Sequence, residues 1–122
     1  MINKIVQFIK ENFEKYQKED DEDLANIVLN HIRHNTFDIL MRKDEIRAVC
    51  RFNVINDGRV ADILDLIISK EEKDGKKIIK YFIARGWMKF PSLVFLRFER
   101  GLKKRSEYRM YRIIKFLKGG KK

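Results

Sequence analysis

The chain has 122 residues, of which 44% are hydrophobic and 38% are charged, and its formal net charge at pH 7 is +10. This length and composition predict one globular domain, residues 1–122, built around a single core. Every apolar run is shorter than the roughly 20 residues that cross a bilayer, and the first residues lack the apolar centre of a signal peptide. We therefore expect a cytoplasmic protein that does not engage a membrane.

The first third of the chain predicts two helices. Apolar residues recur at helical spacing and predict an amphipathic helix over residues 2–16. The acidic cluster at 19–23 suits the positive end of a second helix that begins before Leu24, and it lacks the glycine and alternating ligands of a calcium loop. His31 and His34 are three residues apart without a third ligand in the sequence, so we expect them to line the helix end and predict no metal site.

A three-stranded antiparallel meander follows. Residues 36–42 predict its first strand, and the alternating segments 45–54 and 60–69 predict a hairpin. The intervening Asn56-Asp57-Gly58 supplies the positive φ angles of a tight hairpin turn. Cys50 lies on the apolar side of this hairpin, where we expect a buried, reduced and unreactive thiol.

The second half of the sequence predicts a crossover. Apolar residues at helical spacing predict a helix over 75–89, and residues 92–98 predict a strand parallel to the strand at 60–69, with a cleft where the two separate. We interpret residues 101–106 as a basic turn, whereas 108–117 fits either a helix or a strand. These elements together predict an α+β fold.

Positive charge is concentrated near the C-terminus. Residues 97–122 contain eleven lysines and arginines and two glutamates, which gives this segment a net charge of +9. Such a concentration favours attraction to polyanions, whether a phosphorylated cofactor, a nucleic acid or an acidic protein surface. The last five residues, 118–122, are expected to form a frayed, solvated tail.

The order of two helices, a meander, a Gly/Lys-rich turn into a long helix and an apolar strand resembles the GNAT superfamily of N-acetyltransferases over residues 1–98. The resemblance implies an α/β sandwich in which a mixed, mainly antiparallel sheet with a central parallel strand pair carries helices on both faces. A short chain of this kind is typical, by analogy, of phage or mobile-element copies of such folds.

The resemblance also implies a site for acetyl-CoA. In the family, an (Arg/Gln)-x-x-Gly-x-(Gly/Ala) loop cradles the pyrophosphate, and the backbone of the preceding strand binds the pantetheine arm. In either register this chain has lysine and isoleucine where the glycines of that loop belong, and Gly75 is only a stray glycine, so lysine charge would have to replace part of the cradle. The implied cofactor-binding residues are Leu66, Ile67, Ile68, Lys73, Gly75, Lys76 and Lys77.

Acyl transfer also needs groups that move protons. Asp62 and Asp65 lie on the predicted strand 60–69, on opposite faces by strict alternation, and Asp65 interrupts an apolar run just before the loop. Asp65 is therefore the candidate base. The helix that often carries the family's acidic tyrosine is missing or short here, so Tyr108 and Tyr111 are the candidate acids, with plain packing as the alternative for both.

The resemblance thus implies an acyl-CoA N-acyltransferase that acts on a small-molecule or protein amine. Two other functions stay open as alternatives. In the first, Arg105, Arg109 and Arg112 contact phosphates while the interleaved tyrosines stack on bases, which makes the protein a nucleic-acid binder. In the second, the fold has lost its cofactor and serves as a non-catalytic scaffold. The acceptor and the oligomeric state stay open as well.

Overall fold

The computed structural model describes residues 1–98 and 106–119. In chain order its elements are α1 (Ile2–Asn12), the 3₁₀ helix η1 (Glu14–Tyr16), α2 (Asp21–Arg33), β1 (Phe37–Arg42), β2 (Glu45–Ile55), β3 (Val60–Ile68), α3 (Gly75–Lys89), β4 (Phe95–Phe98), β5 (Ser106–Arg109) and α4 (Met110–Gly119). The strands form one sheet in the order β1-β2-β3-β4-β5, and every pair is antiparallel except β3–β4. The predicted α+β fold and the parallel pair joined by a helix are therefore confirmed.

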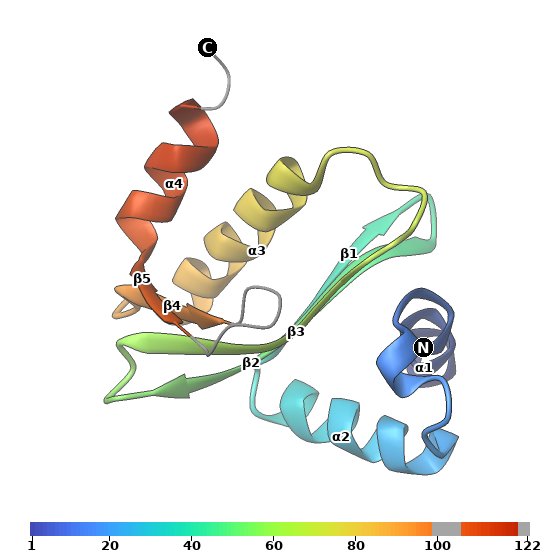
Figure 1. Ribbon diagram of the computed structural model, residues 1–122. Coiled ribbons are helices and arrows are strands. Elements are labelled where there is room, and N and C mark those ends of the chain that lie inside the picture. Colours follow the sequence, from blue (N-terminus) through green and yellow to red (C-terminus); the bar gives the residue numbers. More distant parts are fainter. Residues whose placement is uncertain (99–105, 120–122) are drawn as a thin grey trace.

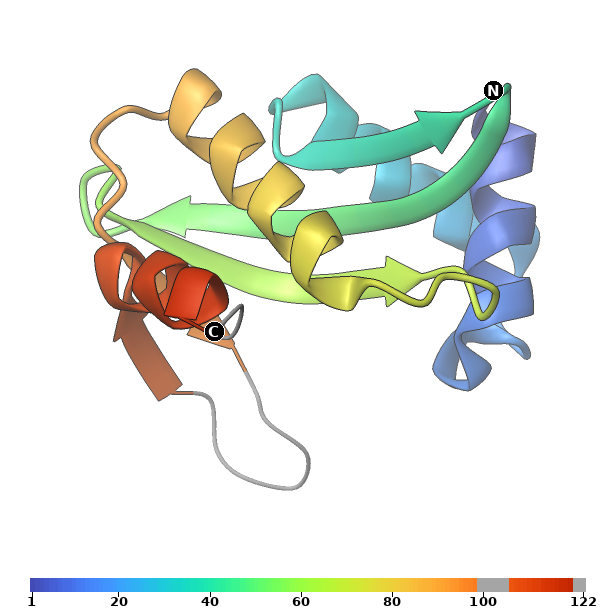
Figure 2. The ribbon, with the colours of Figure 1, turned by 90° about the horizontal axis from the view of Figure 1, so that it is seen from above.

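Helices cover both faces of the sheet, as the resemblance implies (Figure 1). The helices α1 and α2 lie on one face, and α3 and α4 lie side by side on the other (Figure 2). Each face has its own cluster of buried apolar side chains, one around Ile5, Val28 and Val49 and the other around Ile78, Phe82 and Met110. We call these two sides the α1/α2 face and the α3/α4 face.

Local sequence explains the start of α2 and the turn between β2 and β3. The side chain of Asp20 caps α2 by accepting hydrogen bonds from the backbone N–H groups of Glu22 and Asp23. Between β2 and β3, Asn56, Asp57 and Gly58 have φ angles of 52°, 57° and 83°. Asparagine, aspartate and glycine tolerate this left-handed conformation best, so the predicted hairpin turn is confirmed.

Several predicted boundaries are wrong. The first helix stops at Asn12 because Phe13 is extended, with φ −140°, and a separate turn of 3₁₀ helix follows. The strands predicted from residues 36 and 92 begin later, at Phe37 and Phe95, since the Thr36 N–H bonds to the His31 carbonyl and residues 91 and 92 form a turn.

The ambiguous segment 108–117 belongs to both structure types, because β5 ends at Arg109 and α4 begins at Met110. Helix α4 reaches Gly119, two residues into the predicted frayed tail. The predicted basic turn lies outside the described residues apart from Ser106, which begins β5.

A bulge in the β2–β3 hairpin corrects the predicted faces of two aspartates. Arg51 pairs with Asp65, but the next residue, Phe52, pairs with Ile63, so Leu64 is an extra residue in β3. An extra residue shifts the alternation by one. As a result Asp62 and Asp65 both lie on the side of the sheet away from α3, rather than on opposite faces.

Candidate ligand-binding site

The parallel strands β3 and β4 pair over a short distance and then part. The pairing covers Val60–Phe95, Ala61–Leu96 and Asp62–Arg97, whereas β3 continues to Ile68. In the described part of the chain no strand pairs with this second half of β3 on its β4 side. From Leu64 to Ile68, the backbone N–H and C=O groups of that edge have no strand partner among the described residues, so a ligand can pair with them. The predicted separation of the two parallel strands is therefore confirmed.

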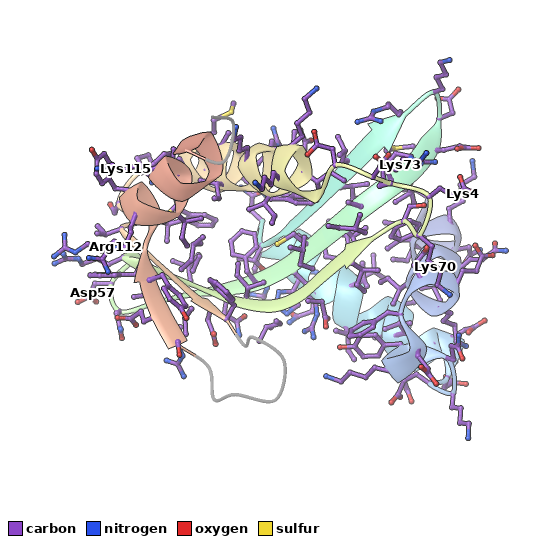
Figure 3. The ribbon with its side chains drawn as sticks, turned by 45° about the horizontal axis from the view of Figure 1, so that its top comes forward. Lys4, Asp57, Lys70, Lys73, Arg112 and Lys115 are labelled. Atoms are coloured by element: carbon purple, nitrogen blue, oxygen red, sulfur yellow. The ribbon has the colours of Figure 1, made fainter. Side chains whose placement is uncertain are left out.

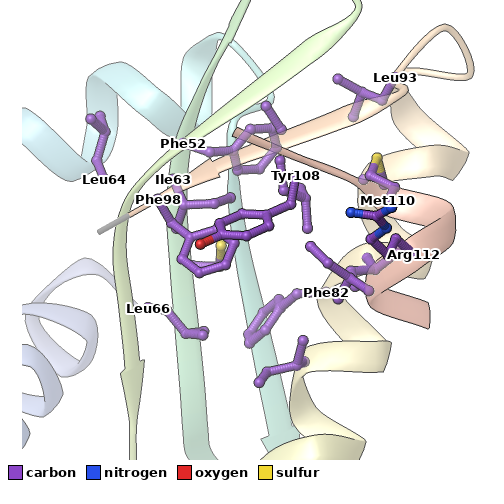
Figure 4. Close-up of a pocket in the computed structure, with 17 residues that line it drawn as sticks. Phe52, Ile63, Leu64, Leu66, Phe82, Leu93, Phe98, Tyr108, Met110 and Arg112 are labelled. Carbon is purple, nitrogen blue, oxygen red and sulfur yellow. The ribbon is translucent and has the colours of Figure 1, made fainter. Parts of the chain in front are cut away.

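A cavity of about 720 Å³ opens beside this edge, on the α3/α4 face (Figure 4). Its walls come from β2, β3, α3, β4, β5 and α4. Figure 4 shows the side chains of Phe82, Phe98 and Tyr108 pointing into the space between the sheet and the helices, with Leu66 at the β3 edge. The volume lies within the roughly 300–1,000 Å³ of pockets that hold small molecules and cofactors.

The cavity wall is apolar except for a few groups. The ring of Tyr108 stacks on that of Phe98, with centroids 5.0 Å apart and planes 27° apart, so one face of this phenol ring is covered. Arg112 lines the cavity from α4 and is exposed to solvent. Burial raises the pKa of the Cys50 thiol to about 12, and the wall therefore carries a neutral thiol at this point. This agrees with the unreactive cysteine expected from the sequence.

The residues that the resemblance assigns to the pantetheine arm divide between the two faces. Leu66 lines the cavity and is 39% exposed, and Ile68 packs in the core of the α3/α4 face. Ile67 is buried against the α1/α2 face. Of these three side chains Leu66 alone lines the cavity, while the backbone of all three lies in the part of β3 beyond its pairing with β4.

The start of α3 combines an acidic cap with exposed lysines. The carboxylate of Asp74 accepts a hydrogen bond from the backbone N–H of Lys77, at 3.2 Å, and so occupies one of the free donors of the helix N-terminus. Lys73, Lys76 and Lys77 are exposed around it, and a Cβ placed on Gly75 would meet no heavy atom within 4 Å. This end therefore offers positive charge and open space rather than the complete backbone cradle of a glycine-rich loop.

The candidate catalytic residues do not converge. Tyr108 lines the cavity, Asp65 lies buried on the α1/α2 face, and Tyr111 is 74% exposed on α4. Asp65 is instead the centre of a polar network that the sequence analysis did not identify. Its carboxylate accepts from the Tyr16 hydroxyl at 2.9 Å and from Nε of Arg51 at 2.7 Å.

The network continues from Arg51 to His31. Thr36 donates its hydroxyl proton to the His31 carbonyl at 3.2 Å. Because that proton is already used, the Thr36 oxygen acts as the acceptor toward the His31 ring, and the Nδ1–H of His31, at 2.8 Å, is the donor. Nε2 of His31 then accepts from Nη1 of Arg51 at 3.2 Å. Burial, and after it the charge of Arg51, lowers the pKa of His31 below its ordinary value of 6.5. A neutral His31 thus fits both of its neighbours.

The two histidines of α2 serve different contacts. His34 bonds through Nδ1 to the Asn30 carbonyl, whereas both ring nitrogens of His31 are used within the polar network. In the described part of the chain, no group of three or more His, Cys, Asp or Glu side chains is arranged to hold a metal ion. Among the described helices, none has the length and apolar character that a bilayer crossing requires.

The two basic regions lie at opposite ends of the molecule. Figure 3 shows Lys70 and Lys73 at one end, beside the start of α3, and Arg112 and Lys115 at the other. Arg109 lies with its guanidinium carbon 5.5 Å from the centre of the Phe95 ring. Arg105, the third predicted nucleic-acid contact, lies outside the described residues.

No protein-family model matches the chain, and the comparison with curated proteins finds no match either. We therefore infer the function of this protein from the separation of β3 and β4, from the cavity beside it and from the charges around both.

Proposed function

We propose that the protein binds an acyl-CoA thioester where β3 and β4 part and transfers the acyl group to an amine, as in the GNAT superfamily. The parting of the parallel strands is the observation that carries this proposal, because it leaves a strand edge, an apolar cavity and the start of a helix next to one another. Each of these three features matches one part of an acyl-CoA molecule.

The pantetheine arm contains two amide groups, and the unpaired edge of β3 offers backbone partners for them. A ligand that adds to a strand edge gains main-chain hydrogen bonds much as an added strand does. The segment from Leu64 to Ile68 is long enough to accept such a ligand, because no strand among the described residues pairs with it on the β4 side.

The phosphates are assigned to the start of α3. Lys73, Lys76 and Lys77 supply positive charge there, and the space beside Gly75 is open. Charge-assisted contacts between lysine and phosphate are shorter and stronger than neutral hydrogen bonds. The Asp74 carboxylate opposes a phosphate at the same position, so binding depends on these lysines more than on backbone amides.

Transfer requires the amine nitrogen to attack the thioester carbonyl carbon, forming a C–N bond as the C–S bond breaks. We assign the hydroxyl of Tyr108 to protonate the departing thiolate, because Tyr108 lines the cavity. Asp65, the base expected from the sequence, is buried on the opposite face of the sheet from Tyr108, so we assign the proton that leaves the amine to water rather than to Asp65. Its oxygens already accept from Tyr16 and Arg51, so Asp65→Asn is the direct test of whether it acts on substrate or holds the fold.

Calorimetry with acetyl-CoA tests binding, and release of free CoA thiol in the presence of mixed polyamines and lysine peptides tests transfer. The double variant Lys76→Glu and Lys77→Glu should weaken binding by about 1 to 3 kcal/mol, because charge-assisted contacts are lost. A matched variant, Lys18→Glu with Lys115→Glu, makes the same change in net charge at exposed positions outside the site. Equal weakening in both, or no heat with millimolar acetyl-CoA, contradicts the proposal and favours a scaffold.

A second function is favoured by the exposure of Arg109, Arg112 and Lys115 along β5 and α4. Cations at this spacing suit the phosphates of a nucleic acid, whose binding is strongly salt-dependent. This surface lies at the opposite end from Lys70 and Lys73, so the two functions are separable by mutation (Figure 3).

A further inference from the structure

We infer that the cavity on the α3/α4 face receives the acyl chain itself, and that the acyl group is a linear chain of medium or long length rather than acetyl. This inference rests on the proposed function, since it names the substrate class of the same site. It is carried by the volume of the cavity, its lining and its position beside the strand edge.

The lining selects an apolar occupant. Aromatic and aliphatic side chains from six elements form the wall, and the Cys50 thiol within it stays neutral. Tyr108 has one ring face covered by Phe98, and Arg112 reaches bulk solvent. Water fills a cavity well when it finds two to four polar partners, and this wall offers few. An alkyl chain needs none.

The volume selects a chain longer than acetyl. Liquid water occupies roughly 30 Å³ per molecule, so a two-carbon acyl group would leave most of the 720 Å³ without contacts. Protein interiors are close-packed, and a void forfeits the dispersion contacts of its lining. A linear chain of eight or more carbons restores those contacts over much of the wall.

The position of the cavity gives such a chain an entrance. Leu64 and Leu66 line it from β3, and Leu66 is 39% exposed, so the wall reaches solvent at the strand edge where the pantetheine arm is assigned (Figure 4). A thioester lying on this edge places its acyl chain next to Leu66, from where the cavity leads inward toward Phe82 and Ile79. One binding mode therefore places the pantetheine arm on the strand edge and the acyl chain in the cavity.

Calorimetry with CoA and with its acetyl, octanoyl, lauroyl and palmitoyl esters tests the inference, below the micelle-forming concentration of each. The affinity should rise about fourfold per methylene until the cavity is filled, because each buried methylene contributes a roughly constant transfer free energy. Acetyl-CoA binding as tightly as the long esters would overturn the chain-length inference and leave the proposed function intact. Laurate binding, with every CoA ester silent, would support the cavity assignment and overturn the proposed function.

A blocking variant locates the chain. Ile79→Trp enlarges a half-buried side chain that lines the cavity and should weaken lauroyl-CoA at least tenfold while leaving CoA unchanged. Ile27→Trp, at a 42% exposed position on α2, is the matched control. Circular dichroism and the Tm confirm folding, and Ile113→Trp replaces Ile79→Trp if the latter unfolds. Unchanged lauroyl-CoA affinity in a folded blocking variant would place the chain elsewhere and overturn the inference.

Discussion

The two faces of the sheet are built in opposite ways. On the α1/α2 face, Tyr16, His31, Arg51 and Asp65 satisfy one another through short hydrogen bonds within a packed apolar cluster. On the α3/α4 face, apolar side chains line a cavity of about 720 Å³. A network of directional bonds fixes one arrangement, whereas an apolar wall tolerates different occupants. The molecule thus combines a rigid face with an adaptable one.

The largest expected effect is the loss of the network. Arg51→Ala leaves the Asp65 carboxylate, 7% exposed, without its cation, and should destabilise the protein by about 3–5 kcal/mol, measured by urea unfolding. Arg42→Ala removes a pair with Glu72 at 3.2 Å in which the arginine side chain is 60% exposed, and should cost about 0–1 kcal/mol. Equal costs for the two variants would show that the α1/α2 face does not depend on this network.

The next prediction tests how loosely the α3/α4 face is packed. Ala48 and Ala61 are both buried strand alanines of one apolar cluster, but Ala61 lines the cavity and Ala48 is 0% exposed within the packed part. Ala48→Val should destabilise by about 1–3 kcal/mol through overpacking. Ala61→Val should be neutral or stabilising, because the added methyl groups enter open space. Equal losses in the two unfolding free energies would mean that the cavity is too rigid to accept a side chain.

Most of the fold could be predicted because it depends on local signals. Strand alternation, the Asn56-Asp57-Gly58 turn and the helical spacing of residues 75–89 identify the hairpin and the crossover. The bulge at Leu64 could not be predicted, since an inserted residue leaves the local apolar pattern plausible in either register. Because of that single residue, the sequence analysis placed Asp62 and Asp65 on opposite faces although they share one.

The candidate site was predicted less completely because it is assembled from distant segments. Tyr16 and Asp65 are 49 residues apart, and Tyr16 was assigned to the end of an amphipathic helix rather than to a network. A possible signal was the inward-facing polar pair of Arg51 and Asp65, each on an otherwise apolar strand. The sequence contains no comparable signal for the cavity. Phe82, Phe98 and Tyr108 have the same spacing in the sequence whether the space between them is filled or open.

A smaller effect links the α1/α2 face to pH. The pKa of His31 is lowered in the folded state by burial and by Arg51, so the unfolded chain binds more protons below pH 6.5. Stability is therefore fully present above pH 6.5 and falls as the pH drops toward the lowered folded pKa. The groups around His31 set this dependence of stability on pH; they are Arg51, Thr36, Tyr16, Asp65 and His34.

Urea midpoints between pH 7.5 and 5 measure this response. His31→Gln should flatten the fall, while His34→Gln, which changes an exposed side chain, should retain it. A wild-type protein whose midpoint rises on acidification, or a His31→Gln variant with an unchanged slope, would show that another group controls the response.

The smallest effect on stability, and the sharpest test of the basic C-terminal end, comes from replacing Arg105, Arg109 and Arg112 with alanine. Arg109 and Arg112 are exposed, and exposed charges contribute little to folding, so the Tm should change little even though Arg109 lies over Phe95. If these arginines neutralise three phosphates, the log-log salt dependence of single-strand binding should have a slope of about −2 and become flatter in the variant. The control Lys4→Ala, Lys70→Ala and Lys73→Ala removes the same charge at the opposite end (Figure 3). An equal change in the control would mean that net charge alone attracts nucleic acid, and no wild-type binding at about 50 mM salt would exclude this function.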